Sequence, residues 1–308
     1  MVKEEIGMAI QTSSKRLIRD QSMSDRVFNV FLWCFTVFIL FIVAYPLFFI
    51  VIASFSDSRL VATGQVYLYP KGFTLAGYKA VFEDSRIWTG YRNTLLYASV
   101  GTMISMFVTI PAAYALSRRD FYARGFFITF FVITMFVRGG LIPTYMTLNN
   151  FHLIDTIWVV LIPFSLSVYN MIIARTFFEN SIPPELHDAA RIDGCSTHQF
   201  FLKVVLPLSK PMLSVIALYY LVGKWNEYFN PLVYLNSENK MPLQVILREI
   251  LIRNQAFESG ISGGDAAQQV ADLIKYSVII ISSAPLLILY PFVQKYFEKG
   301  VMIGALKG

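Results

Sequence analysis

Long apolar runs separated by short polar segments form the main pattern of residues along this chain. An α-helix needs about 20 apolar residues to cross about 30 Å of hydrocarbon. Four runs have about this length with little interruption: 27–55, 94–116, 157–174 and 276–293. Two weaker runs, 126–148 and 204–222, also carry glycine, proline or charged residues. The pattern predicts an all-α integral membrane protein with six membrane-spanning helices.

Composition excludes a soluble globular domain. The chain is 56% hydrophobic and only 15% charged, whereas soluble domains carry about 25% charged residues. The first apolar run is far longer than the apolar core of a signal peptide, about 7–15 residues. We therefore expect it to be a retained span, preceded by a cytoplasmic arm, residues 1–26. Cys34 and Cys195 lie in segments of very different character, which disfavours a disulfide, and no metal-ligand spacing occurs.

The distribution of basic residues predicts the orientation of the spans. If the N-terminus is cytoplasmic, the inner segments hold 15 Lys and Arg residues and the outer segments hold 9. This excess predicts that both termini, and the polar segment 179–210, lie in the cytoplasm. The basic residues flank apolar runs rather than gathering on one face, so the net charge of +6 does not indicate a nucleic-acid partner.

The polar segment after residue 182 begins with the signals of a short helix. Pro183 and Pro184 suit a first helical turn, where a missing N–H costs little. Glu185 and Asp188 then lie near the positive end of the helix dipole. The two alanines that follow present almost no side chain, so this helix can lie close against a facing groove.

A turn and a second helix are predicted next. Gly194 suits a left-handed C-cap that turns the chain sharply. Ser196 or Thr197 can then cap a second short helix. Pro207 and Pro211 are expected to break or redirect that helix before it enters the membrane. The segment is therefore predicted to form two short helices at a fixed angle.

The same segment resembles the docking loop of ABC importer permeases. Members of that family carry Glu-Ala-Ala-x-x-x-Gly followed by Ile-x-Leu-Pro. This chain has Asp188-Ala-Ala, Gly194 and Val204-Val-Leu-Pro207, with aspartate where glutamate is usual. Segments 138–145 and 225–229 and the C-terminal ending also resemble the carbohydrate-uptake permeases related to the maltose system, in the branch of lipoprotein and polysaccharide permeases.

The resemblance implies a type I ABC importer permease with a cytoplasmic coupling-helix loop, in a bacterial cell membrane. It implies a permease domain over 27–298, a docking loop over 179–210 and a cytoplasmic tail over 299–308. It assigns ATPase docking to Glu185, Asp188, Ala189, Ala190, Asp193, Gly194 and Pro207. Cargo would be oligosaccharides or polysaccharide fragments, moved by an ATPase acting through the 183–207 loop.

The resemblance also implies partners. They are a second homologous permease forming a heterodimer, two copies of an ABC ATPase and an extracytoplasmic solute-binding protein, within membrane lipid. This chain would be no enzyme and bind no cofactor, with ATP and Mg held by the ATPase. The absence of a Gly-x-x-x-x-Gly-Lys-Ser/Thr motif from the sequence agrees with that expectation.

Polar and aromatic residues within or beside the spans are candidates for a substrate pathway, because charges at membrane depth usually face protein or water. Interrupted helices also line cavities in many transporters. The candidates are Arg138, Tyr145, Asn170, Tyr220, Trp225, Asn226, Glu227 and Asn230. Structural alternatives stay open: the aromatic residues can form an interfacial belt, and Lys224 can pair with Glu227.

Two other classes of protein remain to be weighed. A secondary transporter driven by an ion gradient needs a carboxylate deep in a span, and only Glu227 comes near, close to a span end. A membrane scaffold would leave the interrupted spans unexplained. A membrane enzyme is disfavoured because His152, His187 and His198 all lie outside the apolar runs, and no Ser/His/Asp arrangement appears.

Overall fold

The computed structural model describes residues 23–137, 139–258, 274–288 and 290–291, and these residues form helices and connecting turns without a strand. The chain divides into two compact units, residues 1–74 and 75–308. The prediction of an all-α protein is therefore confirmed for the described residues. The expected tail over 299–308 and most of the expected arm over 1–26 lie outside them.

The first unit contains one long apolar helix, α2 (Met23–Ser54), which confirms the run predicted over 27–55. Its most apolar window has a mean hydropathy of 2.8. A short helix, α3 (Ser58–Ala62), follows, and the side chain of Asp57 caps it by accepting the Arg59 N–H. Gly72 has φ +62°, and a Cβ there would lie 2.9 Å from the Asp57 Cβ, so this close turn requires glycine.

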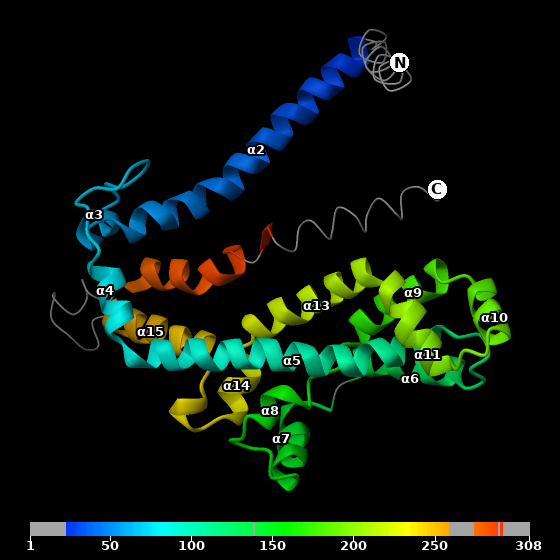
Figure 1. The fold of residues 1–308 in the computed structure, drawn as a ribbon. Coiled ribbons are helices and arrows are strands. Elements are labelled where there is room, and N and C mark those ends of the chain that lie inside the picture. Colours follow the sequence, from blue (N-terminus) through cyan, green and yellow to red (C-terminus); the bar gives the residue numbers. More distant parts are fainter. Residues whose placement is uncertain (1–22, 138, 259–273, 289, 292–308) are drawn as a thin grey trace. The chain divides into compact units, whose positions relative to one another are not determined.

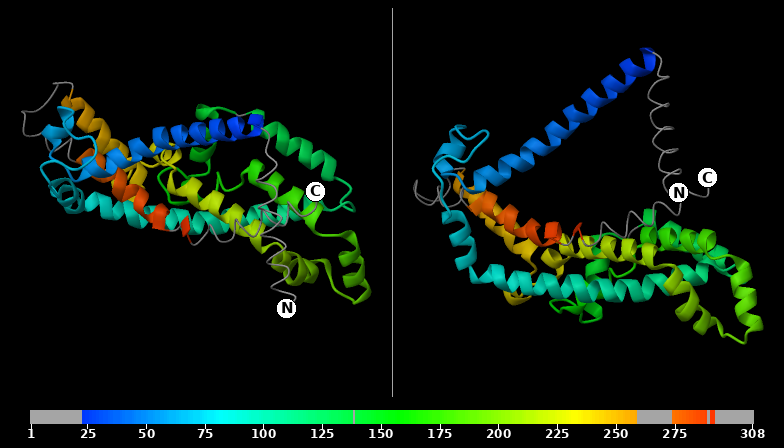
Figure 2. Two further views of the ribbon diagram at one scale, coloured as in Figure 1. Left: turned by 90° about the horizontal axis from the view of Figure 1, so that it is seen from above. Right: turned by 45° about the horizontal axis from the view of Figure 1, so that its top comes forward.

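The second unit is built along α5 (Ser85–Ser117), which follows the short helix α4 (Ala76–Glu83). In Figures 1 and 2, α13 and α15 run beside α5, with α9 packed against its C-terminal part. The core at this crossing centres on Ala113, Ala174 and Ile216, all fully buried. The small side chains of the two alanines let these helices approach closely.

Helix α5 confirms the predicted run over 94–116 and extends it toward the N-terminus. The helix begins at Ser85 because the side chain of Asp84 accepts the Arg86 N–H at 2.9 Å. The added turns are polar on one side, and Ile87 on the other side joins a buried cluster with α15.

The third apolar run is interrupted, as its glycines suggested. It forms α6 (Arg124–Phe136) and α7 (Leu141–Asn150), and the chain between them includes Gly140 at φ +84°. The fifth run is also divided: α11 (Thr197–Phe200), a π-helix (Phe201–Val205) and α12 (Leu206–Leu208) lead into α13 (Lys210–Trp225). The chain bends by 83° between α12 and α13. The predicted redirection near the two prolines is confirmed.

The prediction of one continuous helix over 157–174 is wrong. The segment forms α8 (Trp158–Leu161) and α9 (Val168–Ser181), separated by irregular backbone over 162–167. Pro163 lacks the N–H that a continuing helix would need. Ser167 then starts the new helix, its side chain accepting the Asn170 N–H at 3.4 Å.

The segment 237–272, which is predicted to lie outside the cell, contains a helix that the apolar runs did not reveal. After α14 (Phe229–Tyr234) and a 3-10 turn (Glu238–Lys240), α15 (Leu243–Glu258) packs its apolar face against α5. A further apolar helix, Ile274–Ile288, occupies the last predicted run. By length and composition, two of the described helices can cross a membrane, or four if each bent pair counts as one span. The number six therefore stays a prediction.

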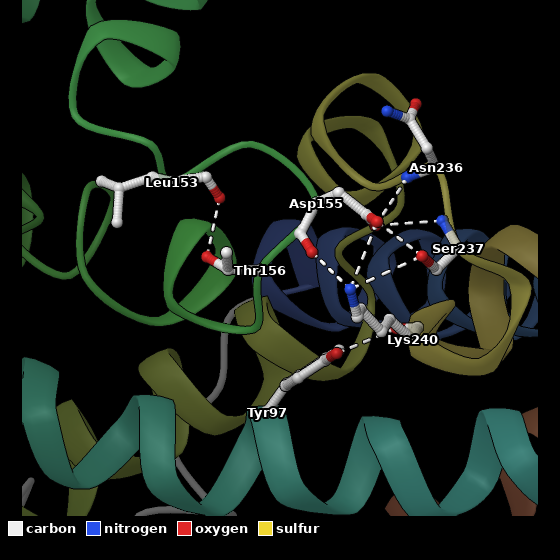
Figure 3. A network of polar contacts seen from close by, with 7 residues as sticks. All are labelled: Tyr97, Leu153, Asp155, Thr156, Asn236, Ser237 and Lys240. Atoms are coloured by element: carbon white, nitrogen blue, oxygen red, sulfur yellow. Dashed lines mark hydrogen bonds and ion pairs between the residues drawn. The ribbon is translucent and has the colours of Figure 1, made fainter.

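A polar network joins the turn after α7 to the segment between α14 and α15 (Figure 3). The carboxylate of Asp155 accepts the N–H groups of Asn236 at 3.0 Å and Ser237 at 2.9 Å, and it pairs with Lys240 Nζ at 3.2 Å. The Tyr97 hydroxyl donates to the Lys240 carbonyl at 2.9 Å. Hydrogen bonds from the side chain and backbone of Ser237 hold the pKa of Asp155 well below its usual range.

Candidate functional site

The polar segment 179–210 folds as two short helices with defined ends. The first, α10 (Pro184–Ile192), has Pro183 at its N-cap, which confirms the predicted first turn. It ends in a Schellman motif: the Cys195 N–H donates to the Ala190 carbonyl at 2.8 Å, and the Gly194 N–H donates to the Arg191 carbonyl at 3.1 Å. Gly194 has φ +74°, so the predicted left-handed cap is confirmed.

A reciprocal cap starts the second helix. The Gln199 N–H donates to Ser196 Oγ at 3.3 Å, and the Ser196 N–H donates to Gln199 Oε1 at 3.1 Å. Of the two predicted cap residues, Ser196 is therefore the one used. The His187 ring meets the buried Phe200 ring edge-on, with centroids 5.3 Å apart. This contact and the two caps fix the angle between α10 and α11.

One face of α10 forms an exposed stripe with i, i+3, i+4, i+7 spacing: Glu185, Asp188, Ala189 and Ile192. Ile192 is 87% exposed, which is unusual for an isoleucine on a polar helix. Ala190 instead packs against the core cluster on the inner side. The loop is thus anchored on one side and open on the other. Three stripe residues were predicted to dock a partner, and Ile192 was missed although its spacing placed it with them.

Two other predicted docking residues, Asp193 and Pro207, are also exposed; Asp193 is the C-cap of α10 and Pro207 lies in α12. The docking role of these residues and of the stripe stays a prediction. The structure shows that the C-cap of α10 and the capping box of α11 hold the segment in a defined conformation.

A charged cleft of about 510 Å³ lies between α10 and the turn after α5. Arg118 Nε donates to Asp120 at 2.8 Å, and this bond raises the pKa of the Arg118 guanidinium and lowers that of Asp120. Glu179 pairs with Arg175 at 2.6 Å and with Arg124 at 3.6 Å. The Arg124–Glu179 pair ties α6 to α9, and Arg175 Nε donates to the Leu116 carbonyl of α5 at 3.2 Å, where the polar loop emerges.

A second cavity, of about 440 Å³, lies among the irregular segment 162–167, α9, α13 and the start of α14. Four of the candidate pathway residues line it: Asn170, Tyr220, Asn226 and Glu227. Sequence reasoning missed Phe164 and Ser167, since it treated their segment as part of a continuous helix. The cavity exists because the helix is broken there.

Two residues of α13 hold that break in place. The Tyr220 hydroxyl accepts the Ser167 N–H at 3.0 Å and shares a 2.6 Å hydrogen bond with Thr109 of α5. Lys224 Nζ donates to the carbonyls of Val160 at 3.1 Å and Phe164 at 3.5 Å. Carbonyls freed by a helix end therefore receive the charged donor, as at a helix C-terminus.

Of the structural alternatives, an ion pair of Lys224 with Glu227 is not formed among the described residues; Lys224 Nζ instead reaches the backbone carbonyls of the broken segment. Glu227 Oε1 accepts a hydrogen bond from Asn230 Nδ2. Thus Asn230 contacts the cavity lining without being part of it.

The remaining pathway candidates lie apart from this cavity. Trp225 is buried and its indole N–H donates to the Ser282 carbonyl at 3.2 Å. Tyr145 stacks on Tyr234 with ring centroids 6.1 Å apart. Both observations favour structural contacts for these aromatic rings. Arg138 lies outside the described residues.

An exposed, capped loop on a bundle of interrupted apolar helices, with a polar cavity at one interruption, is typical of membrane transport proteins. The family model of the binding-protein-dependent transport system inner membrane component matches residues 87–303. The chain belongs to this family. The resemblance inferred from the loop residues is thereby confirmed.

Known proteins resemble this chain over nearly its whole length. The polygalacturonan/rhamnogalacturonan transport system permease protein YtcP of Bacillus subtilis is 35% identical, covering 93% of this chain and 100% of that protein. The arabinooligosaccharides transport system permease protein AraQ of Halalkalibacterium halodurans is 29% identical, with coverage of 93% and 100%. A chain of a bacterial ABC transporter involved in the import of the acidic polysaccharide alginate has 32% identity and a TM-score of 0.81, over 90% of this chain and 99% of that one.

Proposed function

We propose that this chain is the permease subunit of an ATP-driven, binding-protein-dependent importer of oligosaccharides or polysaccharide fragments. The transport systems named for its relatives carry polygalacturonan, rhamnogalacturonan, arabino-oligosaccharides and alginate. Carbohydrate cargo is common to all of them. The polar and aromatic lining of the cavity beside α13 suits such cargo, since sugars offer hydroxyls to polar groups and apolar ring faces to aromatic ones.

The observation that carries the coupling half of the proposal is the exposed stripe of α10. Its residues are held at a fixed angle by the Schellman motif at Gly194 and the cap at Ser196. A separate ATPase docks here, and Ile192 supplies the apolar anchor that a buried interface centre uses. Glu185 and Asp188 then supply charges at the rim, which favour correct orientation more than affinity.

The proposed assembly has six spans, with both termini and the loop in the cytoplasm of a bacterial cell. Support comes from the excess of Lys and Arg in the inner segments, 15 against 9 in the outer ones. The permease domain covers 27–298 and pairs with a second homologous permease. Two ATPase copies bind ATP and Mg and dock from the cytoplasm, and a solute-binding protein delivers cargo outside.

Transport proceeds by alternating access between outward-open and inward-open arrangements. Closure of the ATPase dimer displaces the α10–α11 loop, which is continuous through α12 with α13. Since α13 carries Tyr220 and Lys224, which hold the wall of the cavity, this displacement also changes the cavity. ATP hydrolysis returns the loop and releases cargo inward.

The direct test is to compare Ile192→Glu with His198→Glu, an equally charged change at an exposed residue of α11 outside the stripe. The complete transporter is purified through a tag on this chain, and the amount of co-purified ATPase is measured. The first variant is expected to lose most of the ATPase while retaining the second permease, because the change places a charge in an apolar contact. The second variant should behave as wild type. Full ATPase recovery with Ile192→Glu would overturn the docking assignment.

A gradient-driven transporter remains the competing class, since Glu227 lines the cavity. Uptake measured in cells separates the two. An importer of the proposed kind stops on ATP depletion. Uptake that survives ATP depletion and collapses with an uncoupler would instead establish the gradient-driven mechanism.

A further inference from the structure

The helical segment that leads out of the polar loop contains one wide turn. Residues Phe201–Val205 are π-helical, and the Leu206 N–H donates to the Phe201 carbonyl, five residues back instead of four. Turns of this kind are rare, occur mostly singly within α-helices and are frequent at functional sites. We attribute this one to Pro207, because in an α-helix Pro207 offers no N–H to the Lys203 carbonyl and its ring clashes with that carbonyl.

Packing holds the chain on both sides of the wide turn. At its start, the Phe201 ring lies against the Tyr114 ring of α5, with centroids 4.9 Å apart, and Phe200 is buried. Beyond its end, α13 packs along α5. Leu202, within the turn, is by contrast 47% exposed. A displacement of the loop relative to α13 is therefore taken up between residues 201 and 209, the stretch that leads into the 83° bend.

The residue at the bend also has a buried hydroxyl that nothing uses. Ser209 is fully buried, and its Oγ has no hydrogen-bond partner among the described residues. Its N–H is shared between the carbonyls of Val205 and Leu206, each at 3.1 Å, so its backbone lies between the α and the 3-10 pattern. A serine within a helix can donate to the carbonyl four residues back, as Ser214 does to Lys210 at 2.9 Å. For Ser209 that carbonyl belongs to Val205.

Buried hydroxyls are ordinarily hydrogen-bonded, and one that is not calls for an explanation. The two other unpaired buried hydroxyls in the described part of the chain lie within α5. The hydroxyl of Ser209 differs from them because it lies at a helix break, directly after a π-turn. A change of the π-turn to α-helical hydrogen bonding would bring this hydroxyl its usual helical partner.

We propose that residues 201–209 form a two-state joint between the loop and α13. In the arrangement described above, the π-turn is present and the Ser209 hydroxyl is unpaired. When the loop is displaced, the π-turn rewinds to α-helix and the Ser209 hydroxyl donates to the Val205 carbonyl. An α-helix advances about 1.5 Å per residue, so rewinding a turn that holds one extra residue lengthens the segment by about that amount. The proposal rests on the proposed function, because it is the ATPase that displaces the loop.

Hydrogen exchange of residues 201–209 in the complete transporter tests the change directly. The complex is placed in nanodiscs and measured without nucleotide and after trapping with ATP and vanadate, with the ATPase bound in both states. We expect slower exchange in the trapped state, because the rewound helix gains the Ser209 hydrogen bond and loses the wide turn. Equal exchange in the two states would overturn the joint.

Deletion of Leu202 removes the extra residue of the turn and should fix the segment as an α-helix. The variant is expected to retain the ATPase and the second permease on purification. It should lose the nucleotide dependence of hydrogen exchange and most of the stimulation of ATP hydrolysis by a loaded binding protein. Leu202→Ala, which keeps the number of residues, is the matched control and should behave as wild type. Full stimulation in the deletion variant would contradict the proposal.

A second variant, Ser209→Ala, decides the matter if the deletion prevents assembly. Without nucleotide the hydroxyl has no partner to lose, so Tm of the complex should stay unchanged or rise. In the displaced state the bond to Val205 is missing, so stimulation of ATP hydrolysis should fall a few fold. A lower Tm would indicate a structural role in place of the joint, and so would unchanged stimulation.

The joint and the proposed function can fail separately. Stimulation of ATP hydrolysis in wild type, together with equal hydrogen exchange in the two nucleotide states, would overturn the joint alone. No stimulation by any loaded binding protein would overturn the importer assignment, and the joint with it.

Discussion

The left-handed turn at Gly194 allows a test that separates backbone strain from exclusion of a partner. Its φ of +74° costs an L-residue about 1–2 kcal/mol, and asparagine adopts it more readily. A Cβ added at Gly194 meets no atom within 4 Å, so alanine adds strain without a clash inside the chain. Arginine adds the same strain and also a long charged side chain that projects from the exposed end of α10.

The series Gly194→Asn, Gly194→Ala and Gly194→Arg should therefore give graded results. In proteoliposomes with all partner chains, we expect substrate-stimulated ATP hydrolysis near wild type for asparagine. Alanine should reduce it a few fold, since about 1 kcal/mol shifts a local equilibrium by about fivefold. Arginine should abolish coupling while membrane insertion stays intact.

Two outcomes would refute this reasoning. Normal transport by Gly194→Arg would show that no partner contacts the turn. Equal losses for alanine and arginine would show that strain alone disables the loop, so that the exposed surface plays no part. Insertion is checked for each variant by the yield of this chain in washed membranes.

Three further predictions concern stability. Ser196→Ala should cost about 1 kcal/mol of the cap and speed amide exchange at the start of α11 several fold, whereas Thr197→Ala should not; hydrogen exchange measures both. Tyr220→Phe leaves the partly buried N–H of Ser167 without its partner and should lower Tm of the purified complex by several degrees, while Tyr219→Phe should leave Tm unchanged. Asp155→Asn should lower Tm at pH 7 by about 2–4 °C. Because the pKa of Asp155 is depressed in the folded protein, the stabilisation from its carboxylate is present above the unfolded pKa of about 3.9 and disappears as the pH falls further. The Tm values of wild type and variant should therefore converge in acid.

Local rules were sufficient to predict the polar loop. A proline pair at the first turn, a glycine after the last turn and a serine at the next cap each act through neighbours within a few residues. The structure therefore reproduces both ends of α10 and the start of α11. The break before α13 follows in the same way, from Pro207 and Pro211.

Contacts distant in sequence decided the features that were missed. The run over 157–174 is predominantly apolar and contains a single proline, but its break is held by Lys224 and Tyr220, about 60 residues away. The i, i+3 spacing of Lys224 and Glu227 likewise carries no information about Val160, whose carbonyl accepts the Lys224 ammonium. Periodicity identifies a helix face and cannot identify its partner.

Helix α15 was missed for a different reason. Its apolar residues Leu243, Ile246, Leu247 and Ile250 have the spacing of one helix face, but charged residues between them lower the average hydropathy of the segment. A search for long apolar runs passes over such a helix, whereas a search for helical periodicity finds it. The candidate pathway was predicted only in part. Residue type marked Asn170, Glu227 and Trp225 alike. Only the packing shows that the first two line the cavity whereas the indole of Trp225 bonds to the Ser282 carbonyl.

The 83° bend before α13 determines how a displacement of the loop would reach this helix. A push along the segment Thr197–Leu208 would act nearly at right angles to α13 and would therefore rotate α13 about Ser209. Helix α13 has 16 residues and is about 24 Å long, so a rotation of about 5° at the bend would move its far end by about 2 Å. Tyr220 and Lys224 lie in the second half of α13, so under the proposed function a displacement of the loop would shift the residues that hold the cavity wall.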